Sequence, residues 1–106
     1  MTKRVAVLSM ALWLGLGMAG AVQAAGDPEA GKQKAATCAG CHGPKGVSNN
    51  PEWPNLAGQK EQYLIKQVKA FRDGERSNNL MSPMAKGLSD QDIENLAAYY
   101  SSISCQ

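Results

Sequence analysis

The residues with the most specific chemistry in this sequence are Cys38, Cys41 and His42, which form a C-x-x-C-H motif. This spacing is the attachment signature of c-type haem, because two thiols separated by two residues can reach the two vinyl groups on one side of a porphyrin. The histidine that directly follows is then brought under the iron as an axial ligand. The motif therefore predicts one covalent haem c, held by Cys38 and Cys41, with His42 on the iron.

Two other kinds of site use a C-x-x-C pair, and both fit this sequence poorly. A dithiol redox pair is expected beside a thioredoxin-like βαβ pattern, and strand signals are weak throughout the chain. A structural zinc site needs four protein ligands. Beyond the motif, the sequence offers only Cys105 and no second histidine. Haem is therefore the interpretation that the available residues favour.

The sixth position of the iron needs a different residue type, because His42 is the only histidine. Methionine is the obvious candidate, since a thioether opposite an imidazole is a known haem ligand pair that raises the reduction potential. Met81 and Met84 are the only methionines that follow the N-terminal segment. Both are expected in a loop. A methionine on an apolar helical stripe more often fills a gap in a core, and neither residue is expected on such a stripe. The residues themselves leave either one open as the ligand.

The N-terminal segment has the three-part pattern of a secretory signal peptide. It begins with Lys3 and Arg4, continues without a charge to Ala21, and ends on Val22-Gln23-Ala24, where a signal peptidase finds small residues. We expect cleavage after Ala24 and export to the periplasm. An uncleaved anchor is the alternative, but an apolar run of about 17 residues is at the short end for a bilayer span.

Cleavage would divide the chain into a signal peptide, residues 1–24, and one small domain, residues 25–106, with no membrane span. The net charge of +2 equals the contribution of Lys3 and Arg4, so this domain is formally neutral and carries no basic stripe for nucleic acid. A domain of this size buries a thin core and usually needs a disulfide, a metal or a large cofactor. Three cysteines cannot form two disulfides, so the composition favours a cofactor.

Helical periodicity is the main structural signal in the domain, and no stretch alternates apolar and polar residues for long. Three helices are expected, over about 28–37, over about 59–72, and after Ser89. The segments between them, 43–58 and 74–87, are rich in Gly, Pro, Asn and Ser. Loops of this length usually serve a function. The sequence thus predicts an all-α domain, with three main helices and long loops wrapped around one haem.

Each expected helix has a recognisable end. Asp27 can cap the first helix, with Pro28 at its first position. Gly74 lies just past the second helix, where a left-handed backbone is wanted. Ser89 followed by Asp92 resembles a capping box at the start of the third.

From Gly26 to Ser102 the sequence resembles a class I cytochrome c. It is most similar to the short bacterial monohaem kind and to single domains of the tandem dihaem kind. Gly31, seven residues before the first motif cysteine, matches the small residue at which the family's first helix crosses its last. Tyr99 or Tyr100 stands where the family has the aromatic partner of that glycine. The resemblance therefore implies a class I cytochrome c fold.

Two further matches concern the ligands of the iron. Pro54, twelve residues after His42, matches the proline whose carbonyl accepts the other N–H of the proximal histidine. The family's methionine ligand usually stands seven residues before the leucine that Leu88 matches, which selects Met81 over Met84. The resemblance thus implies His42 and Met81 as the axial ligands.

This resemblance implies an electron carrier rather than an enzyme. Six-coordinate iron has no open position for a substrate, so the haem would cycle between Fe(II) and Fe(III) and pass single electrons. The partners would be redox proteins of a respiratory or other chain, an electron donor and a terminal oxidase or other acceptor. Such encounters are usually small and transient.

Two alternative functions need an open iron. A small haem peroxidase commonly uses a distal histidine, and the sequence has no second histidine. Five-coordinate cytochromes of the bundle type carry the motif near the end of the last helix, whereas here it lies near the start of the domain. A gas-binding or sensor protein with a displaceable sixth ligand stays open as the alternative.

Cys105 departs from the family pattern. It lies one residue from the C-terminus and has no partner once the other two cysteines hold haem. An odd cysteine in an exported protein is a free thiol or half of an intermolecular disulfide. We therefore weigh an incidental tail residue against a dimer linked through Cys105.

Overall fold

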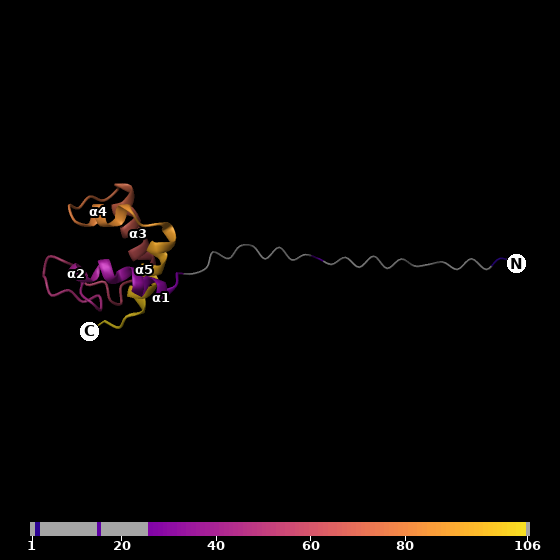
Figure 1. The fold of residues 1–106 in the computed structure, drawn as a ribbon, viewed down its shortest axis with the longest axis horizontal. Helices are drawn as coiled ribbons and strands as arrows, with labels where there is room; N and C mark the ends of the chain where they lie inside the picture. The colour runs from indigo at the N-terminus through magenta and orange to yellow at the C-terminus, as the bar shows by residue number, and fades with distance from the viewer. Residues whose placement is uncertain (1, 3–14, 16–25, 106) are drawn as a thin grey trace.

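The computed structural model describes Thr2, Gly15 and residues 26–105, so the expected signal peptide lies outside the described residues apart from those two positions. In this part of the chain all regular elements are helical, and the all-α prediction is confirmed (Figure 1). None of these helices has the length and apolar character needed to cross a membrane. In chain order they are α1 (Pro28–Lys34), the 3-10 helix η1 (Ala35–Thr37), α2 (Ala39–His42), α3 (Glu61–Asp73), α4 (Met81–Lys86) and α5 (Asp90–Ser102).

The helix ends lie at the predicted capping residues. Asp27 Oδ1 accepts a hydrogen bond of 3.0 Å from the Glu29 amide at the start of α1. Ser89 and Asp92 form a reciprocal capping box, with both side chain to backbone bonds at 3.0 Å. Gly74 follows α3 with a φ of +83°. Local chemistry therefore decides where these helices begin and end.

Helices α1 and α5 come from opposite ends of the domain and cross at Gly31. A Cβ atom at this position would collide with the carbonyl of Asn95 and with the Cβ of Tyr99. The backbones approach this closely only because glycine has no side chain. The predicted contact of a small residue with an aromatic one is confirmed, and the aromatic residue is Tyr99.

The hydrophobic core lies where η1, α3 and α5 meet. Leu96, Ala97 and Tyr100 of α5 are buried against Leu64 of α3 and Ala35 of η1. All of these except Ala35 also line the cavity described below. The core therefore continues directly into the wall of that cavity.

The structure corrects one expectation, because segment 74–87 is not a continuous loop. Met81–Lys86 forms the short helix α4, so both candidate methionines lie on a helix. Asn78 Oδ1 accepts a hydrogen bond of 3.0 Å from the Met81 amide. This bond gives a partner to one of the first-turn N–H groups that have no acceptor within the helix. Pro83 argued against a helix in the sequence. Proline is nevertheless tolerated in the first turn of a helix, because an N–H group there has no acceptor within the helix.

Candidate functional site

The C-x-x-C-H motif forms α2, a single helical turn that follows η1. The His42 amide donates to the Cys38 carbonyl at 2.9 Å, which closes this turn. Cys38, Cys41 and His42 all line one cavity, while the two residues between the cysteines lie outside its wall. The turn therefore brings the three reactive side chains of the motif to one surface.

The cavity has a volume of about 780 Å³, which lies within the range of roughly 300–1,000 Å³ that is usual for sites of small molecules and cofactors. Three helices supply its apolar wall on the sides away from the motif. A large apolar ring suits this wall, and two thiols, an imidazole and a thioether are the groups that hold a haem c. The apolar wall residues of these helices include Leu64, Val68 and Phe71 of α3, Met81, Met84 and Ala85 of α4, and Leu96, Ala97 and Tyr100 of α5.

His42 is buried, with only 6% of its surface exposed. Its Nδ1 lies 2.8 Å from the carbonyl oxygen of Pro54, as the family pattern predicts. A carbonyl can only accept, so Nδ1 donates this bond and carries the proton. The lone pair on Nε2 is then available for a metal, and the ring orientation is held by the backbone. The imidazole is thus prepared for an iron ligand.

The three cysteines differ in their surroundings, and none of them forms a disulfide. Burial raises the pKa of the Cys38 thiol above its ordinary value, more than the hydrogen bond from Thr37 lowers it. Cys41 is exposed at the edge of the same cavity. Cys105 lies apart from that cavity wall, and its Sγ donates to the Ala57 carbonyl at 3.2 Å. The dimer through Cys105 stays a prediction.

Both methionines of α4 line the cavity, so the structure brings both candidates for the sixth ligand to one wall. Met84 is 49% exposed, whereas Met81 is partly buried at the first position of the helix. Met81 is also the methionine whose amide is bound by Asn78. The choice of Met81 as the ligand stays a prediction, because both side chains line the cavity.

Part of the cavity wall was not identified from the sequence. Gln67 and Trp53 both line the cavity, and Gln67 Oε1 accepts a hydrogen bond of 2.8 Å from Arg76 Nη1. The Arg76 guanidinium also lies 4.5 Å from the centre of the Phe71 ring. The helical spacing of Gln67 and Phe71 shows that they share a face. The family resemblance places Arg76 near the haem edge, but it does not show that Arg76 binds Gln67 and Phe71 after α3 has ended.

The helical fold and the motif-lined cavity define a small protein of the cytochrome c class. The family model described as Cytochrome c matches residues 28–104, and the chain belongs to this family. It is 53% identical over 81 residues to cytochrome c-554(548) from Halomonas halodenitrificans, covering 74% of this chain and 98% of that relative. It is 47% identical over 95 residues to cytochrome c4 from Pseudomonas aeruginosa, covering 90% of this chain and 47% of that one.

A solved structure agrees with these matches. Reduced recombinant cytochrome c4 from Pseudomonas stutzeri aligns with a TM-score of 0.72 and 45% identity, over 76% of this chain and 47% of that chain. This chain thus spans about half the length of the cytochromes c4 that it matches. It corresponds to one domain of a dihaem cytochrome and to nearly all of cytochrome c-554(548).

Membership of the family confirms the class I cytochrome c prediction. The protein is an electron carrier with one haem c, attached covalently through the motif of Cys38 and Cys41, and it is not an enzyme. As a cytochrome c it exchanges electrons with redox partners.

Proposed function

We propose that this cytochrome is a periplasmic electron shuttle whose iron is held between His42 and Met81. The observation that carries the proposal is the buried imidazole of His42, bound at Nδ1 by the Pro54 carbonyl and facing the cavity that Met81 also lines. With both axial positions filled by the chain, no site is left for a substrate. The haem supplies one-electron chemistry, the change between Fe(II) and Fe(III).

The residues of the chain hold and insulate the ring. Cys38 and Cys41 fix one edge of the haem, and His42 is kept in one tautomer by its bond to Pro54. The apolar side chains of α3 and α5 exclude water from the ring. Exclusion of water and a thioether ligand both change the reduction potential of a haem.

The cavity rim suits brief contact with redox proteins that donate an electron or, as a terminal oxidase or other acceptor, receive one. Tyr63, Leu80 and Met84 are large hydrophobic side chains that line this cavity. Apolar contacts of limited area favour brief encounters and fast release.

Export to the periplasm is part of the proposal, with residues 1–24 removed as a signal peptide. A start close to Ala25 is compatible with the fold, because Gly26 and Asp27 are already packed against α5. A Cβ at Gly26 would collide with the Glu94 carbonyl, and the Asp27 amide donates to Asn95 Oδ1 at 2.8 Å. Mass spectrometry of the periplasmic fraction tests this directly. We expect a polypeptide that begins at Ala25 with one haem attached, and a chain that retains Met1 would contradict cleavage.

Absorption spectroscopy of the exported holoprotein tests the ligand pair. We expect sharp bands in the reduced form, the weak far-red band of a Met–Fe(III) bond in the oxidised form, and no response to CO at neutral pH. A high-spin spectrum with prompt CO binding would contradict the proposal and support the gas-binding alternative instead.

A further inference from the structure

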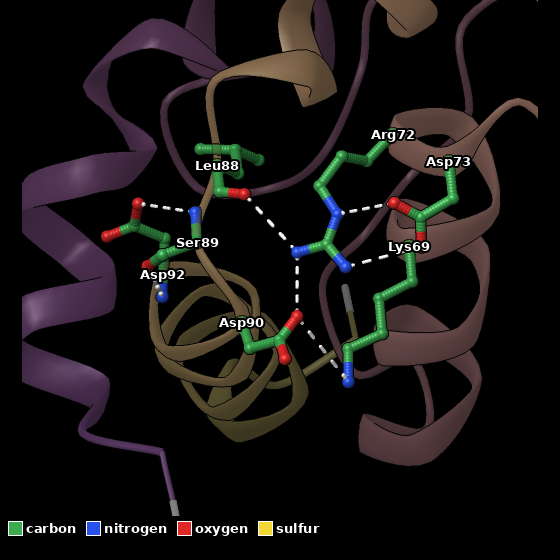
Figure 2. Close-up of polar contacts among 7 residues, drawn as sticks. All are labelled: Lys69, Arg72, Asp73, Leu88, Ser89, Asp90 and Asp92. Atoms are coloured by element: carbon green, nitrogen blue, oxygen red, sulfur yellow. Dashed lines mark hydrogen bonds and ion pairs between the residues drawn. The ribbon is translucent and has the colours of Figure 1, made fainter.

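Arg72 joins the last turn of α3 to the corner between α4 and α5 (Figure 2). Its Nη1 donates to the Leu88 carbonyl at 3.3 Å and to Asp90 Oδ1 at 2.7 Å. Its Nε and Nη2 donate to the two carboxylate oxygens of Asp73 at 2.8 and 3.3 Å. One guanidinium thus binds its own helix and a segment that lies 16 residues further along the chain.

Arg72 is the most buried member of this cluster. The Arg72 side chain is only 19% exposed, whereas Asp73 and Asp90 are 51% and 64% exposed. An exposed ion pair contributes little by itself. The bond to the Leu88 carbonyl differs, because it joins α3 to the backbone of the corner between α4 and α5. The side chain that makes this bond is also held by Asp73. Lys69, whose Nζ lies 3.9 Å from Asp90 Oδ1, has no hydrogen bond to that carbonyl.

Helix α4 depends on such contacts for its position, because a helix of six residues is not stable alone. Its first turn is bound locally by Asn78. Its other end is tied through Leu88, whose amide donates to the Ala85 carbonyl at 3.0 Å and whose carbonyl accepts from Arg72. Ala85 is 1% exposed and lines the cavity. Arg72 is therefore linked to the helix that carries Met81, although it does not line the cavity itself.

We propose that Arg72 is a positioning residue for the sixth ligand. By holding Leu88 against α3 it keeps α4, and with it Met81, in place at the cavity wall. This inference rests on the proposed function, because it takes Met81 as the residue on the iron. Loss of the Arg72 contacts raises the fraction of molecules in which α4 has moved away and the sixth position is open.

The fraction of molecules with an open sixth position can be measured by the binding of an external ligand. The apparent affinity of a ligand that needs the open state is proportional to the population of the open state. Imidazole added to the ferric holoprotein is a suitable probe, with the far-red Met–Fe(III) band reporting displacement. We expect Arg72→Ala to bind imidazole roughly five- to tenfold more tightly than the unsubstituted protein, as the net loss of one ordinary hydrogen bond suggests. Hydrogen exchange should accelerate in α4 amides and stay unchanged in α1.

Three variants separate positioning from general stability. Asp27→Ala removes the cap of α1, which packs mainly against α5, and should lower the melting temperature without changing imidazole affinity. Asp73→Asn weakens the contact that holds the Arg72 side chain and should raise the imidazole affinity, by less than Arg72→Ala does. Arg72→Lys keeps the charge near Asp90 but lacks the planar set of donors of a guanidinium. Its imidazole affinity should therefore lie between those of the native protein and Arg72→Ala.

The outcomes are distinct. Native imidazole affinity in Arg72→Ala, or an equal gain of affinity in Asp27→Ala, would overturn the positioning role while the ligand assignment stands. If the unsubstituted protein itself lacks the far-red band, Met81 is not the ligand, and the proposed function and the positioning role fail together.

Discussion

His42 Nδ1 donates a hydrogen bond of 2.8 Å to the carbonyl of Pro54, twelve residues further along the chain. The contact joins the one-turn helix of the motif to the loop that follows it. It determines which ring nitrogen carries the proton and therefore which one is free for iron. These two residues thus prepare the proximal side of the site.

The two methionines of α4 give a matched pair of variants. Met81→Ala should keep haem attached, lose the far-red Met–Fe(III) band and lower the reduction potential, because a thioether ligand raises that potential. Met84→Ala should retain the band, since the family's spacing to Leu88 selects Met81 as the ligand. Absorption spectra and a redox titration of both holoproteins check this. The reverse pattern would assign the ligand to Met84.

Cys41→Ser should impair covalent retention of haem and leave much of the chain unfolded, because the core continues into the wall of the haem cavity. Acidified solvent extraction measures the covalent fraction, and far-ultraviolet circular dichroism measures helix content. Cys105→Ser is the matched control and should keep both haem and fold, since Cys105 does not line that cavity. A well-folded, haem-free Cys41→Ser protein would show that the core does not need the ring.

Gly31→Ala should destabilise the fold by about 1–3 kcal/mol, the usual cost of forcing an extra carbon into a packed contact. The added Cβ would meet the Asn95 carbonyl and Tyr99, so α1 and α5 would have to separate. Denaturant unfolding of the holoprotein gives the free energy. Gly87→Ala is the control, because its φ is −86° and no atom lies within 4 Å of its added Cβ. Equal stability of the two variants would show that the crossing tolerates a side chain.

The carboxylate of Asp90 predicts a pH-dependent contribution to stability. The hydrogen bond from Arg72, and then the charge of Lys69, lower its pKa below the ordinary value. A lowered pKa in the folded state stabilises the fold above the unfolded pKa, and this contribution is lost as the pH falls through the folded value. Asp90→Asn should therefore be less stable than the native protein at neutral pH and equally stable in strong acid.

Unfolding of both proteins at a series of pH values, from about 7 down to about 3, tests the Asp90 contribution. The difference between the two proteins is the informative quantity, because acid acts on every other carboxylate and on the haem ligands of both alike. A difference that stays constant across this range would mean that the Asp90 charge adds nothing to the folded state.

The local features of this protein could be predicted from sequence because their causes lie within a few residues. The C-x-x-C-H spacing predicts covalent haem c from the reach of two thiols. The caps at Asp27 and at Ser89 and Asp92 follow from side chains that bond amides two or three residues away. The family pattern extended this reach to Pro54, whose carbonyl is where the pattern places it.

Tertiary structure decided the features that depend on distance in space. Helix α4 is too short to be recognised from periodicity, and its six residues depend on Asn78 at one end and on Leu88 at the other. Only packing shows that Tyr99, rather than its neighbour Tyr100, meets Gly31. The contact between Arg72 and Leu88 spans 16 residues and has no sequence pattern, because it exists only where two helices and the corner between them converge.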